Sequence, residues 1–255
     1  MKLIEAIDTA NHKVISLVGG GGKTTLMFAL AKELITHERF LITTTTTKIF
    51  KPSHLESANV LINKVEEEII ELFLQKKDVA EHITIASEML ASGKLKGITP
   101  ELVDKLAKLN QISHIIVEAD GAAHKPLKAP DTHEPVIPHS TSLVIIVVGI
   151  DSLGCKLTEE NVFRAEIASK LLGIKPGETV TAESIATLIT ASQGLVKGSP
   201  EHASIICFIN KVEAASLPKA RHLASTILEM KHPQITAVLL GSAQATDPVI
   251  ESLPS

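Results

Sequence analysis

The chain has 255 residues, of which 44% are hydrophobic and 21% charged, a composition typical of a globular protein. The net charge is -4 and only 2% of the residues are aromatic, with no Trp and no Tyr. Neither a polyanion-binding surface nor an aromatic platform for single-stranded nucleic acid is therefore expected. The first residues lack the apolar core of a signal peptide, and no apolar run approaches the roughly 20 residues that cross a bilayer. We therefore expect a cytoplasmic protein without membrane or nucleic-acid partners.

Apolar β-branched runs alternate along the chain with segments that have apolar residues at helical spacing. The expected strands cover 14–18, 40–47, 82–87, 113–120, 143–150, 204–210 and 235–241. The expected helices cover 23–35, 65–75, 100–110, 157–172, 181–192 and a segment between the last two strands. Together with the glycine-rich segment GGGGKTT after the first expected strand, this alternation predicts an α/β fold with a doubly wound, mostly parallel sheet and helices on both faces, a P-loop NTPase-like three-layer sandwich. We expect one such domain over residues 1–255.

A glycine-rich loop, GGGGKTT, follows the first expected strand and opens the first long helix. Glycines allow backbone amides to approach phosphates closely, and the helix N-terminus adds partial positive charge. The full phosphate-loop pattern has a glycine at the position of Leu17, so this is a shorter version, as in Mur-type ligases. In this interpretation Lys23 reaches the β- and γ-phosphates and the Thr24 hydroxyl binds Mg²⁺. The predicted nucleotide-binding residues of the loop are Gly19, Gly20, Gly21, Gly22, Lys23, Thr24 and Thr25.

Two carboxylates close the strand over 113–120, which ends in Glu118, Ala119 and Asp120. Ligands bind at the carboxyl ends of parallel strands, and a phosphate loop needs a neighbouring carboxylate for Mg²⁺ or for the attacking water. The period of two places Glu118 and Asp120 on one side of the strand. We predict Lys23, Glu118 and Asp120 as catalytic residues, with Asp120 and Thr24 as metal ligands.

Two further signals predict recognition of the nucleotide base. Asn210 and Lys211 follow a strand, as in the N-K-x-D element of guanine-binding proteins, although Glu213 stands in place of the Asp. Ser242 and Ala243 follow the next strand and resemble the S-A element that contacts guanine. Together these matches favour GTP over ATP as the nucleotide that accompanies Mg²⁺.

Other polar residues near these strand ends are candidates for a switch or for binding a second substrate. Thr46, Thr47 and Lys48 close the second strand, either as part of a β-branched strand or as a source of a Mg²⁺ ligand. A stretch with four prolines, residues 125–138, is expected to be an irregular functional loop. Its polar residues suit a solvated loop better than a zinc site. The remaining candidates in and around this loop are His124, Lys125, Lys128, His133, Glu134, Asp151 and Arg164, the last on the helix expected over 157–172.

Over nearly its whole length the chain resembles the YqeC family, which is associated with accessory proteins of selenium-dependent molybdenum hydroxylases. The segments that carry the resemblance are 18–25, 44–50, 117–121, 124–130, 133–138, 163–166 and 210–212, together with Gly149, Asp151 and Gly154. Glu213 departs from the Asp that is usual in the family. The resemblance implies a role in maturing or inserting a selenium-containing molybdenum cofactor, with a molybdenum hydroxylase or a selenium-handling protein as partner.

Three hypotheses for the activity stay open at this point. The first is a Mg²⁺-dependent GTPase or broader NTPase whose hydrolysis drives cofactor maturation. The second is an ATP-dependent kinase-like or ligase-like phosphoryl transferase, which the shorter loop favours. The third is a nucleotide-gated binding module that does not hydrolyse its nucleotide.

Overall fold

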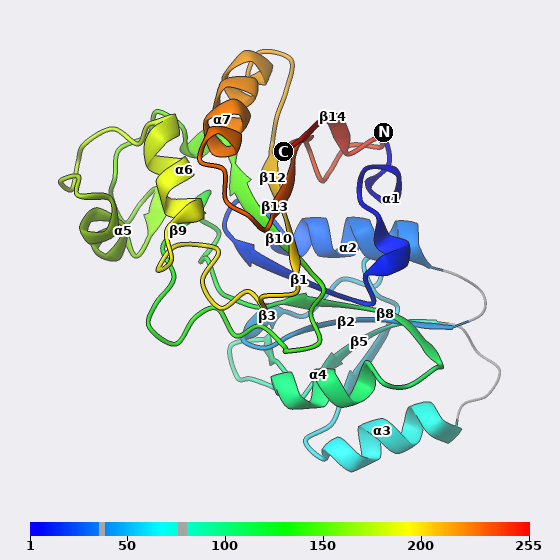
Figure 1. Cartoon of the computed structure of the whole chain (residues 1–255). Helices are drawn as coiled ribbons and strands as arrows, with labels where there is room; N and C mark the ends of the chain where they lie inside the picture. Colours follow the sequence, from blue (N-terminus) through cyan, green and yellow to red (C-terminus); the bar gives the residue numbers. More distant parts are fainter. Residues whose placement is uncertain (36–38, 76–80) are drawn as a thin grey trace.

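Nine strands form the central sheet of the computed structural model, which describes residues 1–35, 39–75 and 81–255 (Figure 1). These strands are β1 (Val14–Gly19), β2 (Phe40–Thr45), β4 (Asn59–Ile62), β5 (His82–Ala86), β8 (Ile112–Glu118), β10 (Leu143–Gly149), β12 (Ser204–Asn210), β13 (Ile235–Gly241) and β14 (Val249–Pro254). Their order is β14-β13-β12-β10-β1-β8-β2-β5-β4. All neighbouring pairs are parallel except β13 and β14.

The central strands are apolar on both faces because helices cover both sides of the sheet. Every residue of β1 and of β10 is buried. In β1, Ile15 and Leu17 point to one hydrophobic cluster, whereas Val14 and Val18 belong to clusters on the other face. The chain leaves β1 toward β2 and later crosses back to β10 on the opposite side of β1. The carboxyl ends next to β1 are therefore a topological switch point, where such sheets bind ligands.

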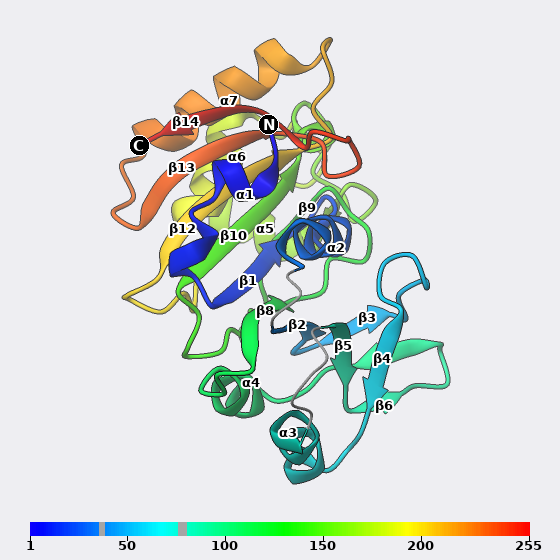
Figure 2. The same ribbon diagram turned by 90° about the vertical axis from the view of Figure 1, so that its right-hand side faces the viewer.

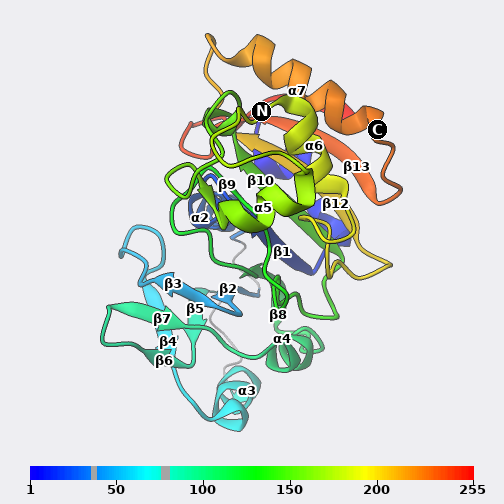
Figure 3. The same ribbon diagram turned by 90° about the vertical axis from the view of Figure 1, so that its left-hand side faces the viewer.

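The helices divide between the two faces. In Figure 1, α5 and α6 lie across the sheet from α1 and α2, and Figures 2 and 3 view these two sides from the front. The helices α3 and α4 pack on the cluster that contains Val14, which places them on the face away from α2. The helical segments are α1 (Leu3–Ala6), η1 (Thr9–Asn11), α2 (Lys23–Leu34), α3 (Glu66–Gln75), α4 (Pro100–Leu106), η2 (Ile150–Ser152), α5 (Ala165–Leu172), α6 (Ala182–Thr190) and α7 (Leu217–Glu229).

The predicted α/β fold with a doubly wound, mostly parallel sheet is confirmed, but two expected helices are too long. The helix expected over 100–110 ends at Leu106. The segment 157–172 becomes helical only from Ala165. The Glu159 carboxylate accepts hydrogen bonds from the amides of Arg164 and Ala165, and so caps the helix from upstream. Arg164 therefore precedes α5 in a left-handed conformation (φ 62°), rather than lying on the helix as expected. Within the described ranges, every helix is too short or too polar to cross a membrane.

Two small sheets lie outside the central one. A three-stranded antiparallel sheet consists of β3 (Lys48–Phe50), β7 (Lys94–Lys96) and β6 (Glu88–Met89). The amide of Gly97 donates to Thr47 and that of Ile98 to Thr45, which anchors this sheet at the carboxyl end of β2 (Figure 3). A two-stranded parallel pair consists of β9 (Leu127–Lys128) and β11 (Val162–Phe163). The proline-rich stretch is otherwise irregular, as expected.

Candidate functional site

The glycine loop joins β1 to α2 through a tightly packed turn. Gly21 has φ +76°, and a Cβ atom there would lie 2.2 Å from the Gly149 nitrogen. A Cβ atom on Gly22, at φ +117°, would lie 2.5 Å from the Asn210 side chain. A side chain at either position would collide with its neighbour in a conformation that L-residues rarely adopt. The run of glycines therefore lets the loop fit between β10 and the end of β12.

Three of the four glycine amides already have acceptors within the protein. Gly19 donates to Asp120 Oδ2 at 3.1 Å, Gly20 to the Val147 carbonyl at 2.9 Å, and Gly21 to the Lys125 carbonyl at 2.8 Å. Among the described residues, no acceptor is found for the amides from Gly22 to Thr25. These amides open the twelve-residue helix α2, where unpaired N–H groups favour an anion. The amides available to a phosphate are thus those of Gly22 to Thr25, not those of all four glycines.

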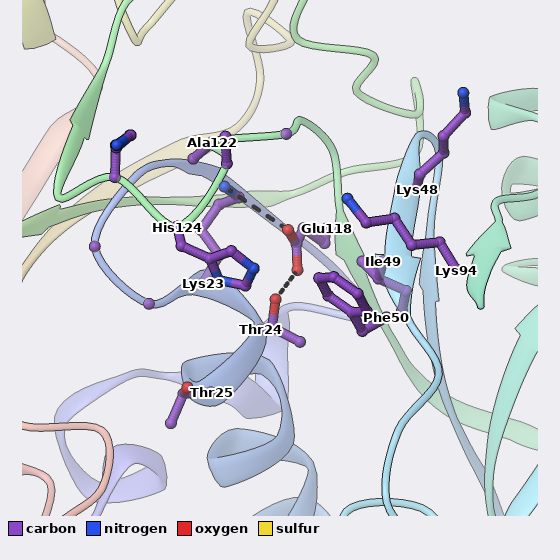
Figure 4. A pocket seen from close by; sticks show the side chains of 15 residues that line it. Lys23, Thr24, Thr25, Lys48, Ile49, Phe50, Lys94, Glu118, Ala122 and His124 are labelled. Carbon is purple, nitrogen blue, oxygen red and sulfur yellow. Dashed lines mark hydrogen bonds and ion pairs between the residues drawn. The ribbon is translucent and has the colours of Figure 1, made fainter. Parts of the chain in front are cut away.

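Lys23 is 4% exposed and lies at the centre of the site (Figure 4). Its Nζ donates to the Gly19 carbonyl at 2.6 Å and lies 3.1 Å from Asp120 Oδ1 and 3.8 Å from Glu118 Oε1. Burial by itself lowers the pKa of Lys23, but the carboxylates of Asp120 and Glu118 outweigh burial and raise it. Lys23 is therefore a fixed positive charge, which the carboxylates of Asp120 and Glu118 balance.

Glu118 and Thr24 face each other across the same site. The Thr24 hydroxyl donates to Glu118 Oε2 at 2.6 Å (Figure 4). Burial raises the pKa of Glu118, against the lowering effect of Lys23 and Thr24. Carboxylate and hydroxyl oxygens are the ligands that Mg²⁺ prefers, and proteins commonly use one or two carboxylates together with substrate phosphates. In addition, the fully buried Asp120 Oδ1 accepts no hydrogen bond of good geometry from any described residue. The donor set therefore fits Mg²⁺.

Asp120 also connects the glycine loop to a second group of charges. Lys128 is fully buried, and its Nζ lies 3.1 Å from Asp120 Oδ2, 2.6 Å from Glu134 Oε2 and 2.8 Å from the Gly121 carbonyl. Arg164 binds Glu134 through two nitrogens. Burial alone raises the pKa of Glu134, but hydrogen bonds from Arg164 and Lys128 outweigh it and lower the pKa to about 2. These residues form a continuous ion-pair network behind the site.

A pocket of about 280 Å³ opens in front of Lys23 and Glu118. Its walls are the glycine loop, the segment from Gly121 to Lys125, and side chains of the three-stranded sheet. Sequence analysis predicted Lys48, His124 and Lys125 in this region and missed Phe50 and Lys94, which also line the pocket. The one available signal was Phe50, a large aromatic residue within a segment that resembles the family. Lys94 lies in a three-residue strand too short to have a recognisable pattern.

The residues expected to recognise the base are arranged around Asn210. Its side chain donates to the Gly21 carbonyl at 2.7 Å and accepts from the Ala243 amide at 2.9 Å. Asn210 thereby ties the glycine loop to the turn after β13. Lys211 pairs with Asp151 at 2.7 Å near the surface. Glu213 is exposed, and its amide donates to the Ser216 hydroxyl.

The other candidates lie away from the pocket. Thr46 donates to the Val136 carbonyl at 2.6 Å, and the Thr47 hydroxyl is 3.1 Å from that of Thr45. Both threonines thus hold the proline-rich segment and the turn after β2, and neither lines the pocket. His133 is exposed, and Ser242 is half-buried beside Ala243. The assignment of any of these residues to a ligand stays a prediction.

The sheet, the switch point and the loop between β1 and α2 define an α/β protein of P-loop-like architecture. Residues 15–166 match the family model described as "YqeC protein". The chain is 32% identical over 240 residues to the "Uncharacterized protein YqeC" of Escherichia coli (strain K12), a match that covers 91% of this chain and 88% of that protein. The chain belongs to the YqeC family.

Proposed function

We propose that the protein binds a nucleoside triphosphate with Mg²⁺ and hydrolyses it. The observation that carries this proposal is the position of Lys23 at the start of α2. Its ammonium group is held by Asp120 and Glu118 at the end of β8, beside backbone amides that find no acceptor among the described residues. A lysine, unpaired amides and two carboxylates at a switch point are the elements that phosphoryl-transfer sites share.

In this proposal the phosphates replace the carboxylates as partners of Lys23. The amides of Gly22 to Thr25 hold phosphate oxygens, and Lys23 Nζ turns from Asp120 and Glu118 toward the β- and γ-phosphates. Thr24 and Glu118, already in contact at 2.6 Å, hold Mg²⁺, with Asp120 as the alternative carboxylate. When bound, Mg²⁺ neutralises part of the charge that develops on the phosphates. The carboxylate that does not hold the metal orients the attacking water.

We favour GTP over ATP as the nucleotide. The contacts of Asn210 with Gly21 and Ala243 support this choice, because they place the N-K element beside the S-A element and the glycine loop. Glu213 has one methylene more than the Asp of a guanine site, so ATP is the alternative. From the family resemblance we infer that turnover serves maturation of a selenium-containing molybdenum hydroxylase cofactor.

A second candidate function is a kinase-like or ligase-like phosphoryl transfer. The lysines that line the pocket opposite the glycine loop favour it, because they provide a binding surface for an acceptor substrate. Hydrolysis by water needs no such surface. A nucleotide-gated module without hydrolysis is the third possibility. It differs from both by measurable nucleotide affinity without phosphate release.

The test is nucleotide titration and phosphate release with the Lys23→Met variant, with and without Mg²⁺. We expect Mg²⁺-dependent nucleotide binding in the unchanged protein and at least roughly 100-fold slower turnover in the variant, because charge stabilisation at the phosphates is lost. Thermal unfolding shows whether the variant is folded, since Met leaves two buried carboxylates without their partner. Lys219→Met, at an exposed position of α7, is the matched control. Equal turnover and equal affinity in the two variants contradict the proposal.

A further inference from the structure

The pocket in front of the glycine loop has a cationic wall that the phosphate site does not use. Lys48 and Phe50 of β3 and Lys94 of β7 face the loop across the pocket, and His124 also lines it (Figure 4). Lys125 is a further lining residue. Within the described residues, Lys48, Lys94 and Lys125 form no ion pair with a carboxylate. Among the described residues that line the pocket, Glu118 is the one carboxylate. In a chain with a net charge of -4, this wall favours an anionic ligand.

Phe50 gives the wall a flat apolar face. Its exposed fraction is 51%, whereas Phe28, Phe40, Phe73 and Phe208 are buried. The Phe50 ring stacks on the imidazole of His124, with centroids 5.5 Å apart and planes 24° apart. Lys94 Nζ lies 4.6 Å from the centre of the same ring. Ala123 and His124 both have positive φ (46° and 62°), a strained backbone of the kind that ligand-binding sites retain.

The strand order separates this wall from the residues that we assign to the nucleotide base. Asn210 ends β12 and Ala243 follows β13, on one side of β1, whereas Lys48 and Phe50 belong to β3, which follows β2 on the other side. A nucleotide whose phosphates lie on the glycine loop and whose base lies near Asn210 thus points its terminal phosphate toward Glu118 and Lys94. The wall then faces the end of the triphosphate, not the base.

We propose that Lys48, Phe50, Lys94 and His124 form the subsite of a second substrate, next to the terminal phosphate. The ligand class is a small anion, a phosphate or carboxylate compound, that also has a flat conjugated ring. The ring stacks on Phe50 in the place that His124 covers in this structure, and the anionic group binds the lysines. This inference rests on the proposed function, because the glycine loop must hold the nucleotide for the two ligands to meet.

The test uses naphthalene-1,5-disulfonate, a flat dianion, titrated calorimetrically into the full chain saturated with the Mg²⁺ complex of a non-hydrolysable GTP analogue. We expect the probe to bind, and ethane-1,2-disulfonate and naphthalene-1,5-diol to bind about tenfold more weakly, because each lacks one half of the recognised chemistry. Phe50→Ala and Lys94→Ala each lower probe affinity about tenfold while affinity for the analogue stays the same. Phe50→Tyr restores probe binding. Met230→Ala and Lys219→Ala, at exposed positions on and beside α7, are the matched controls.

Three results overturn this inference. In the first, the probe does not bind the unchanged chain. In the second, the probe displaces the analogue. In the third, Lys94→Ala lowers the affinity for the triphosphate analogue but leaves the affinity for GDP unchanged. The last would assign the lysines to the terminal phosphate. If neither this analogue nor its ATP counterpart binds, the proposed function fails. Titration of the probe into the nucleotide-free chain and into its Phe50→Ala variant then decides the subsite separately.

Discussion

The Lys128 ammonium lies 3.1 Å from the Asp120 carboxylate, and both side chains are fully buried. Asp120 in turn contacts Lys23 and accepts a hydrogen bond from the Gly19 amide, so Lys128 is connected to the glycine loop through a single residue. On its other side Lys128 binds Glu134 of the proline-rich segment. This segment and the candidate phosphate site are therefore parts of one electrostatic unit.

We expect Lys128→Met to lower the free energy of unfolding by about 3–5 kcal/mol, because it leaves Asp120 and Glu134 buried without their shared partner. Chemical denaturation at neutral pH measures this loss. Lys219→Met, at an exposed position, serves as the control and is expected to change stability by less than about 0.5 kcal/mol. A similar small effect at Lys128 would mean that the buried network contributes little to stability.

The low pKa of Glu134 predicts a dependence of stability on pH. Its pKa falls from an ordinary 4.5 to about 2 in the folded chain, so the ionised carboxylate stabilises the fold above pH 4.5, and this stabilisation is lost as the pH falls through about 2. The shift corresponds to at most about 3 kcal/mol. Denaturation of the unchanged chain and of Glu134→Gln should therefore show a stability difference that is large at neutral pH and shrinks toward pH 2. A difference that does not vary with pH would contradict this origin.

Alanine substitutions at Gly21 and Gly177 distinguish the effect of close packing in the glycine loop from the effect of backbone conformation. Both have positive φ, +76° and +85°, but no atom of the described residues lies within 4 Å of a Cβ atom on Gly177. We expect Gly177→Ala to cost about 1–2 kcal/mol. Gly21→Ala should cost clearly more and should also weaken nucleotide binding, because its Cβ meets Gly149 at 2.2 Å. Denaturation and nucleotide titration measure both effects, and equal losses would show that the close contact is unimportant.

The choice between GTP and ATP can be tested at Glu213. This side chain is exposed and follows the buried Asn210 in the N-K element. If it reads the base, Glu213→Asp should strengthen GTP binding relative to ATP, since the shorter carboxylate matches the usual guanine element. Competitive titration of the two nucleotides against both proteins measures the change. A clear preference for ATP that Glu213→Asp leaves unaltered would remove the guanine interpretation.

The fold and the centre of the candidate site could be recognised without coordinates. Strands such as β1 and β10 are apolar throughout because both faces of a parallel sheet are covered, and this produces an unambiguous pattern. The run Gly19 to Gly22 before Lys23 and Thr24 is a local signal, since its neighbours in sequence are its neighbours in space. The strand-end acids Glu118 and Asp120 were found for the same reason.

Contacts between residues far apart in the chain could not be predicted from the sequence. Which carboxylate meets Thr24, and whether Lys128 reaches solvent or a buried Asp120, depends on how β8 and the proline-rich segment pack against the loop. Phe50 and Lys94 come together through antiparallel pairing of β3 and β7, strands too short to have a period. Local propensity and hydrophobic spacing thus established the main alternation of strands and helices and the position of the glycine loop. The partners of each buried charge followed from tertiary packing, because low-dielectric surroundings force such charges to pair with whichever opposite charge the fold brings within reach.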